Sequence, residues 1–455
     1  MTTHAGESLE AAIQRTGSAV DLLRNSQRRA FSHGTVSGQF TNWQGEVNSW
    51  CDGVGFMDQS HHMVDDYIRG PGAFDLLKHL AANSFEGFVP GMAKQFVAAA
   101  PDGNYLGDCV LFYLANEELS LVGRPTSLDW VRYHIETGNW NVSHERDPQS
   151  MDRGGRPPIC YRYEAQGPMA GALMEKVTGA PLPDVKFFGM TDFTIAGKRV
   201  RALRHGMAGA IGFEIFGPWA DGEGVREAIL SAGEEFGLTL VGSTAYSTAN
   251  LESGWVPGPL PAIFDQPELK AYREWLPAKA AGSLAGSYAP ENIADYYVTP
   301  HDLGYGRIVK FDHDFVGAEA LQERIKNPQR KKVTLIWDAD DMARVTSSAW
   351  REGPKYKHFN MPKARYGLYQ MDQVLSDGRK AGISLDCGYL ANDRKIVSLA
   401  VLDEEFATPG TEVSLLWGEA PNSLKPQVEA HEQTELKAIV APCPYGTNAR
   451  TAYRK

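Results

Sequence analysis

The stretch from Gly242 to Pro257, GSTAYSTANLESGWVP, contains the residues of this chain that are best suited to chemistry. Small residues surround Tyr246, and a carboxylate, Glu252, and a large aromatic residue, Trp255, follow it. Small residues let the backbone approach a ligand closely, which favours a loop over a helix or a regular strand. A phenol has a pKa of about 10, so Tyr246 stays protonated near neutrality and is able to donate a proton. The commoner alternative is a surface turn with a buried aromatic anchor.

Two ionisable residues elsewhere lie in patterns that favour a binding role. Glu214 stands between Phe213 and Ile215 on a short predicted strand, and a buried carboxylate is costly unless it has a partner. Such a carboxylate can accept paired N–H bonds from a heterocycle such as a pterin. Arg124 lies in a Gly-Arg-Pro turn, where its guanidinium can hold a carboxylate through two parallel hydrogen bonds. The alternative for Arg124 is an ordinary surface arginine.

Adjacent histidines, His61 and His62, lie between two predicted strands in Gly53–Gly70. Strict strand alternation would place Gln59 and His61 on one face and Ser60 and His62 on the other. The two histidines therefore cannot both reach one metal ion, and the sequence has no HExxH or comparable cluster. We expect no metal site, although either histidine is able to line a pocket.

Two further segments hold polar residues that are able to reach a cleft. Asp108 precedes the apolar run CVLFYL in a predicted hairpin, Val97–Tyr113, and its alternative is a solvated strand end. Phe31 and His33 belong to an aromatic and polar segment, Phe31–Trp50, that either lines a pocket or wraps the edge of a core.

Composition limits the class of protein. A chain of 455 residues is too long for one hydrophobic core, so we expect two or three domains. No apolar run reaches the length of a bilayer span, and the first residues lack the pattern of a secretory signal. The net charge of −11 argues against nucleic-acid binding. Five widely spaced cysteines without a CxxC pair are typical of reduced thiols in the cytoplasm.

A repeated pattern predicts the elements that position these residues. A strand, a Gly-Pro turn and a helix in Tyr67–Leu80 recur in Tyr161–Gly179, which suggests two related α/β lobes. We expect helix in Leu9–Ser26, a connection in Asn139–Pro158 and a long covering loop in Pro257–Pro300. The lobes are predicted to occupy residues 1–326, with the second beginning near residue 159. Short strands and turn signals predict an all-β module in residues 327–455.

Several blocks of sequence resemble one known family. The motifs of dinucleotide-binding, P-loop, serine hydrolase and cobalamin proteins are absent. FMDQSHHM followed by DDYIRGPGAFDLL resembles the FDVSHM–RGPDAL signature of the T-protein (aminomethyltransferase) family. QGP, GFEI, NLESG and LGYGRIVKFDHDFVGAEAL resemble later blocks of the same family in the same order, from about Ser26 to Leu321.

Within that family the chain is similar to the tetrahydrofolate-dependent aromatic O-demethylases, which act on lignin-derived methoxybenzoates. HHMVD, RALRHGMAG, NLESGW, LKAYREWLP, ADYYV and RKKVTL carry this resemblance. It implies an α+β cloverleaf of two related α/β lobes plus a C-terminal β-barrel, with tetrahydrofolate in the central cavity. It also implies a small methoxybenzoate as the substrate, with no nucleic-acid or membrane partner.

The resemblance implies roles for individual residues. Tyr246 matches the catalytic tyrosine, and His62, which matches a pocket position near the oxygens of the aromatic ring, is the second catalytic candidate. A proton donor there would stabilise the phenoxide that leaves when an aryl methyl ether is cleaved. The implied substrate-binding residues are Gln59, Ser60, Arg124, Phe31 and His33. The implied cofactor-binding residues are Glu214, Trp255 and Asp108.

Two departures from the family pattern bear on the substrate. The paired aspartates of the T-protein appear here as Gly107-Asp108, which fits an ether substrate better than a lipoyl-bound amine. Ala30-Phe31-Ser32-His33 replaces a tyrosine-rich sequence of vanillate-type demethylases, which would leave room for a second methoxy group. We therefore expect syringate ahead of vanillate or 3-O-methylgallate. An aminomethyltransferase and a folate-binding protein without catalysis are the alternatives.

Overall fold

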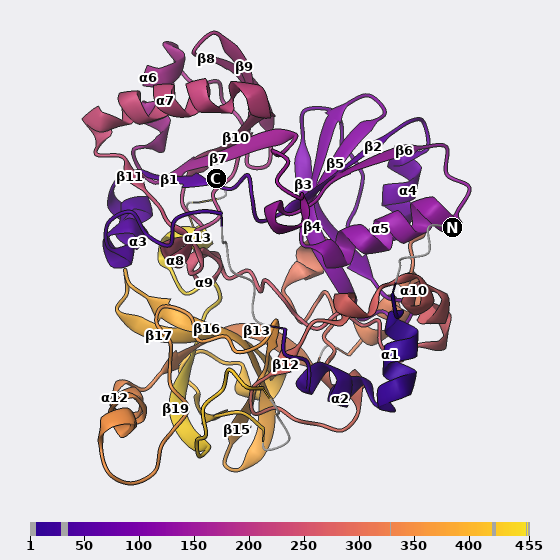
Figure 1. Ribbon diagram of the computed structural model, residues 1–455, viewed down its shortest axis with the longest axis vertical. Coiled ribbons are helices and arrows are strands. Elements are labelled where there is room, and N and C mark those ends of the chain that lie inside the picture. The colour runs from indigo at the N-terminus through magenta and orange to yellow at the C-terminus, as the bar shows by residue number, and fades with distance from the viewer. Residues whose placement is uncertain (1–5, 29–34, 328, 421–424, 452, 454–455) are drawn as a thin grey trace.

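The computed structural model describes residues 6–28, 35–327, 329–420, 425–451 and 453 (Figure 1). Phe31 and His33 therefore lie outside the described residues. Two open β-sheets and a closed β-barrel form three parts around a common centre, as the T-protein resemblance implies. The expected α+β cloverleaf with a C-terminal barrel is confirmed.

The first sheet is antiparallel throughout, with the strand order β3-β4-β5-β2-β6. Two helices pack on it, and one of them, α5, begins at Pro125, where the fixed φ of proline suits the first helical position. The strands are β2 (Val64–Arg69), β3 (Ala93–Ala99), β4 (Tyr105–Ala115), β5 (Glu118–Gly123) and β6 (Ser143–Asp147), and the helices are α4 (Ala73–Leu80) and α5 (Pro125–Thr137).

The second sheet has the order β11-β1-β7-β10-β9-β8, and among its pairs only β1 with β11 is parallel. Its helices α6 and α7 lie together at the top of Figure 1. The strands are β1 (Gly55–Asp58), β7 (Cys160–Gln166), β8 (Met190–Ile195), β9 (Lys198–Arg204), β10 (Gly212–Pro218) and β11 (Thr239–Leu240), and the helices are α3 (Trp43–Asp52), α6 (Ala170–Thr178) and α7 (Gly222–Gly233).

The two sheets are interleaved along the chain, because β1 belongs to the second sheet and β2 to the first. The repeat of strand, Gly-Pro turn and helix is confirmed in β2–α4 and β7–α6. Residues 59–63 form a turn between the two predicted strands, so strand alternation does not apply to them. This crossing brings Gln59, Ser60 and His62 to the junction of the sheets.

The C-terminal strands close into a barrel of order β13-β17-β16-β15-β18-β19, which confirms the expected all-β module. A helix, α12 (Ala339–Ser347), follows the first strand. The domain boundary near residue 327 remains a prediction. The barrel strands are β13 (Arg330–Trp337), β15 (Asp372–Ser376), β16 (Arg379–Leu390), β17 (Lys395–Asp403), β18 (Glu412–Trp417) and β19 (Thr434–Ala441).

Four local predictions were wrong. The N-terminal helix is two helices, α1 (Leu9–Thr16) and α2 (Ala19–Arg24), because Gly17 takes a φ of 78° and Ser18 caps the second. The connection before residue 158 contains β6, and the covering loop contains a helix. The stretch around Tyr246 is helical as well, since packing overrides the low propensity of its small residues. These helices are α8 (Ser243–Tyr246), α9 (Ala249–Ser253) and α10 (Lys270–Trp275), and the remaining elements are α11 (Ala318–Arg324), α13 (Thr447–Thr451), β12 (Leu284–Ala285) and β14 (Tyr369–Gln370).

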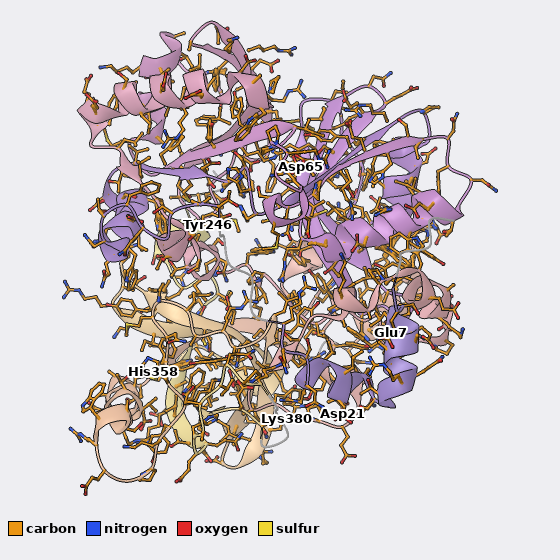
Figure 2. The ribbon with its side chains drawn as sticks, viewed as in Figure 1. Glu7, Asp21, Asp65, Tyr246, His358 and Lys380 are labelled. Carbon is orange, nitrogen blue, oxygen red and sulfur yellow. The ribbon has the colours of Figure 1, made fainter. Side chains whose placement is uncertain are left out.

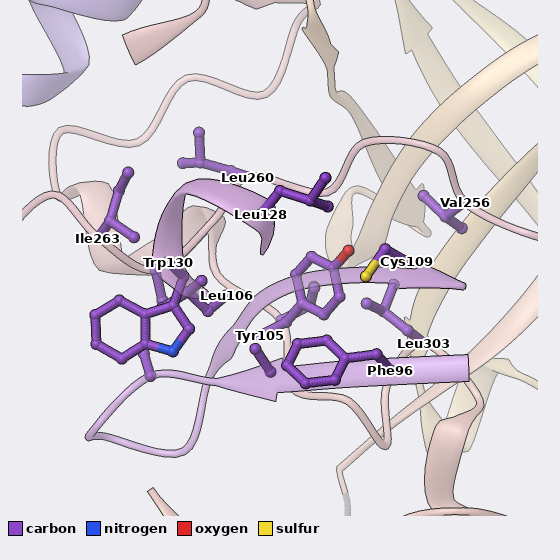
Figure 3. Close-up of a cluster of buried hydrophobic side chains, with 14 of the residues drawn as sticks. Phe96, Tyr105, Leu106, Cys109, Leu128, Trp130, Val256, Leu260, Ile263 and Leu303 are labelled. Carbon is purple, nitrogen blue, oxygen red and sulfur yellow. The ribbon is translucent and has the colours of Figure 1, made fainter. Parts of the chain in front are cut away.

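One hydrophobic core joins the first sheet to the covering segment and to one side of the barrel. Figure 3 shows part of it, with Phe96 and Tyr105 of the sheet, Leu260 of the covering segment and Leu303 just beyond that segment. The covering segment is therefore an interior layer that fixes the barrel against the lobes.

No helix in the described ranges is long and apolar enough to cross a membrane. All five cysteines are free thiols. Among the described residues, no group of three His, Cys, Asp or Glu side chains is arranged to hold a metal ion.

Candidate active site

A cavity of about 1270 Å³ lies where the two sheets and the barrel meet. Small-molecule pockets usually span about 300–1,000 Å³, so this cavity has room for more than one ligand. Four predicted site residues line it: His62, Arg124, Tyr246 and Trp255. Gln59, Ser60, Asp108 and Glu214 are buried outside its lining.

Tyr246 is the last residue of α8, and Figure 2 labels it between the second sheet and the barrel. Its hydroxyl lies 3.1 Å from His62 Nε2, and the two rings meet edge to face at 5.1 Å. The start of α8 is fixed by Gly242, where a Cβ atom would lie 2.5 Å from the backbone oxygen of Gly38. We expected the backbone here to approach a ligand closely; at Gly242 it instead approaches the backbone of Gly38.

The environment of Tyr246 keeps its hydroxyl protonated. Burial raises the pKa of Tyr246 well above its ordinary value, and the nearby carboxyl groups of Glu164 and Glu214 raise it further. His62 is able to donate a hydrogen bond to the phenol oxygen or to accept one from it, depending on its tautomer. The pair therefore offers the cavity a phenol that can donate a proton and a neighbour that can support the resulting phenolate.

Glu164 is a site residue that our reading of the sequence missed. It is fully buried on β7, accepts hydrogen bonds from Gln59 Nε2 and from the Met207 N–H at 2.5 Å, and Met207 lines the cavity. Glu164 lies directly opposite Glu214 in the β7–β10 pair. Burial, with the like charge of Glu214 as a smaller cause, raises the pKa of Glu164 to about 8, so this carboxyl is mostly neutral near neutrality.

A signal for Glu164 was present in the sequence. Strand β7 reads CYRYEAQ, and Tyr161, Tyr163 and Ala165 all belong to the core of the second lobe. Alternation places the polar residues Arg162, Glu164 and Gln166 on the opposite face, where all three are buried. A strand with one apolar and one buried polar face is typical of a sheet that borders a functional cavity.

Arg162 is the partner of Glu214. Its guanidinium donates to Glu214 Oε1 at 2.8 Å and to Asp65 Oδ2 at 2.9–3.0 Å, and it packs against the rings of Phe112 and Phe216. We expected a buried Glu214 to have a partner, and Arg162 is that partner. The structure does not bring Glu214 to the cavity wall, so its predicted contact with a pterin remains a prediction.

Asp108 also acts behind the cavity wall. It is buried within β4, so the solvated strand end is wrong, and it accepts a 2.8 Å hydrogen bond from Trp255 Nε1. Gln95 and two tyrosines, Tyr105 and Tyr305, donate to the same carboxylate. Asp108 therefore orients the indole of Trp255, which lines the cavity.

The other predicted residues also lie either in the cavity wall or behind it. The Ser60 hydroxyl is held by the backbone of Arg162, which accepts at 3.2 Å and donates at 2.9 Å, so Ser60 fastens the crossing between the sheets. Arg124 caps α5, donates from Nη1 to the Pro257 carbonyl and is half-buried in the cavity wall. His61 turns away from His62, and its ring nitrogens lie near Ser150 and Asp58.

The fold and the cavity define a cloverleaf one-carbon transferase. The solved structure of the glycine cleavage system aminomethyltransferase T from Bartonella henselae matches with a TM-score of 0.60 at 17% identity, covering 90% of each chain. The model of the GCVT N-terminal domain family matches residues 25–257. The chain belongs to this family, an enzyme family whose members use tetrahydrofolate as the one-carbon acceptor.

Curated relatives make the likeness more specific. The chain is 46% identical to a syringate O-demethylase of Sphingobium sp. (strain NBRC 103272 / SYK-6), over 98% of each chain. It is 30% identical to a sesamin methylene transferase of Sinomonas sp. (strain No.22), over 83% of this chain and 82% of the relative. An aminomethyltransferase of Streptomyces avermitilis is 26% identical over 79% of this chain. The protein is thus an enzyme of this family and a homologue of a syringate O-demethylase.

Proposed function

We propose that the protein moves a methyl group from a lignin-derived methoxybenzoate, with syringate as the preferred substrate, to tetrahydrofolate. The observation that carries this proposal is the pair of Tyr246 and His62 on the wall of a cavity with room for two ligands. The likeness to a syringate O-demethylase over nearly the whole chain supports it. The products are 5-methyltetrahydrofolate and a phenol.

The residues of the cavity fit the cleavage of an aryl methyl ether. A phenoxide is a poor leaving group, and a general acid that protonates the leaving oxygen contributes typically about 10²–10⁴-fold to the rate. Tyr246 is protonated, so it donates its hydroxyl proton to the ether oxygen as the bond from oxygen to the methyl carbon breaks. The imidazole of His62, 3.1 Å from the same hydroxyl, then stabilises the tyrosinate by hydrogen bonding.

The cavity also fits the acceptor. Tetrahydrofolate, when bound, would supply the nucleophilic nitrogen for the methyl group, and the proton released from that nitrogen would balance the one that Tyr246 gives to the phenol oxygen. Trp255 provides an aromatic wall, and Asp108 holds its indole in place. The neutral carboxyl of Glu164 lies behind Met207, where it adds no negative charge near the reacting phenol. Free thiols and a folate acceptor suit a reaction in the cytoplasm.

Arg124 is the proposed partner of the substrate carboxylate. It lines the same cavity as Tyr246, and among the described residues no carboxylate lies within ion-pair distance of its guanidinium. A half-buried arginine without an acidic partner is suited to bind a carboxylate through paired N–H bonds.

The test is a product assay with purified protein, tetrahydrofolate and either syringate or vanillate under reducing conditions. We expect 5-methyltetrahydrofolate and 3-O-methylgallate from syringate. Turnover of vanillate alone would keep the mechanism and reject the preference for syringate. Failure with both substrates would reject the proposal in favour of amine substrates or of a binding protein without catalysis.

A further inference from the structure

Three arginines from separate parts of the chain line one region of the cavity. Arg28 follows α2, Arg124 caps α5 of the first lobe, and Arg365 lies in the barrel module before β14. Each donates to a backbone carbonyl: Arg28 to Lys279, Arg124 to Pro257, and Arg365 to Leu368 at 2.5 Å. Carbonyl groups satisfy some of the N–H donors but leave the positive charges uncompensated.

Arg124 and Arg365 are close neighbours. A Cβ atom built on Gly258 would lie 2.4 Å from Arg124 Nη1 and 3.4 Å from the Leu368 oxygen, which is the oxygen that Arg365 contacts. The two guanidinium groups therefore reach the place where the backbone at Gly258 and the backbone at Leu368 meet. Only a glycine at position 258 allows this approach, since any side chain would displace Arg124.

The described part of the chain neutralises this pair of arginines only in part. Nε of Arg365 lies 3.9 Å from Asp386 Oδ1, beyond hydrogen-bond distance, and Oδ2 of the same carboxylate is bound by Lys363 and by Asn250 Nδ2 at 2.6 Å, so one buried carboxylate serves two cations. Nε of Arg365 is buried and has no hydrogen-bond partner among the described residues. Two neighbouring cations in a partly buried site are unfavourable unless an anion joins them.

We propose that Arg365 acts together with Arg124 to bind the carboxylate of a ligand, so that the barrel completes the binding site. This inference rests on the proposed function, which supplies two candidate carboxylates, that of the methoxybenzoate and those of the glutamate tail of folate. Two guanidinium groups present forked N–H donors to both carboxylate oxygens, which selects an acid over a neutral ligand of the same shape.

The first experiment measures syringate binding to the protein without tetrahydrofolate, by calorimetry, for the wild type and for Arg365→Leu. We expect the dissociation constant to rise about 10- to 100-fold, as for loss of a charge-assisted hydrogen bond in a buried site. Arg365→Lys keeps the charge without the fork and should give a smaller loss. Arg351→Leu, at an exposed arginine of the same module, is the matched control and should bind as the wild type.

The second experiment identifies the carboxylate. Binding of 2,6-dimethoxyphenol, which is syringate without its carboxylate, should change less than about twofold in Arg365→Leu if Arg365 binds the substrate. If Arg365 binds the folate tail, the loss appears with tetrahydrofolate and disappears with tetrahydropteroate. Equal losses for ligands with and without carboxylates, or no loss at all in a variant with unchanged melting temperature, would overturn the inference. Wild-type turnover of syringate tests the proposed function separately.

Discussion

At the scale of single residues, two buried acids decide the character of the site. Tyr246 and Glu164 both have a raised pKa, and burial is the main cause for each. A neutral Glu164 avoids a second negative charge near the phenol, and a protonated Tyr246 is ready to act as an acid. Neither property belongs to an isolated tyrosine or glutamate; both arise because the surroundings exclude water.

Replacement of Tyr246 by phenylalanine tests the general acid. We expect Tyr246→Phe to lower kcat for syringate by about 10²–10⁴-fold, because the variant cannot protonate the leaving oxygen. The ring is kept, so the melting temperature and syringate binding should stay close to those of the wild type. Full turnover by this variant would reject the role.

Glu164 makes the stability of the protein depend on pH. Its pKa is about 8 when folded and near 4.5 when exposed, so the folded state binds a proton more tightly. The stabilisation is complete below pH 4.5 and is lost as pH rises towards 8, at no more than ~1.4 kcal/mol per pH unit. Urea unfolding of Glu164→Gln from pH 5 to 8 should show a shallower decline than the wild type. Parallel curves for the two proteins would contradict this assignment.

At the scale of elements, the connections between strands carry the site. The turn between β1 and β2 delivers His62, the N-terminus of α5 delivers Arg124, and the helices α8 and α9 with the turn after them deliver Tyr246 and Trp255. Asp108 ties several elements together, because donors from β3, from β4, from Trp255 in the turn after α9 and from Tyr305 converge on its carboxylate.

Asp108→Asn should loosen this junction. An amide has one oxygen and cannot accept all of these hydrogen bonds, so a buried donor is left unsatisfied, at a cost of about 1–3 kcal/mol in the free energy of unfolding. Denaturant unfolding followed by tryptophan fluorescence measures the loss. Trp255→Phe removes a single donor and should cost less; an equal or larger cost would show that Asp108 does not organise the group.

At the scale of the whole molecule, buried charges join the parts. Arg162 on the second sheet pairs with Glu214 on the same sheet and with Asp65 on the first, and Figure 2 labels Asp65 where the two sheets meet. The covering segment and the barrel share a hydrophobic core with the first sheet. The cavity exists only because these three parts are held in a fixed arrangement.

Arg162→Leu should destabilise the whole protein. The change leaves the carboxylates of Asp65 and Glu214 buried without their cation, which typically costs about 3–5 kcal/mol. Thermal unfolding should show a clear fall in Tm. Arg199→Leu on strand β9 of the same sheet breaks an exposed pair with Asp192 and is the matched control, for which no measurable change is expected. Equal Tm values for the two variants would contradict the role of Arg162.

The amino-acid sequence by itself determined the order of the main helices and strands and the residue types of the site. Local periodicity and turn residues sufficed for the two repeats of strand, turn and helix, because backbone sterics and apolar spacing act over a few residues. Residue types and spacing singled out Tyr246, Trp255, Arg124 and His62, the family resemblance implied their roles, and the structure brings all four to one cavity. Short helices such as α8 and the edge strand β6 were missed, since packing rather than propensity forms them.

Only the tertiary structure decided which of these residues face the cavity. Glu214 and Asp108 are carboxylates of the kind that could bind a ligand, but within the protein they accept hydrogen bonds from Arg162 and Trp255. Glu164 and Arg365 belong to no motif that we recognised in the sequence. Their positions depend on contacts between residues that are about 50 to 110 positions apart in the chain. Burial and charge pairing arise from the packing of distant segments, so a local sequence pattern does not encode them.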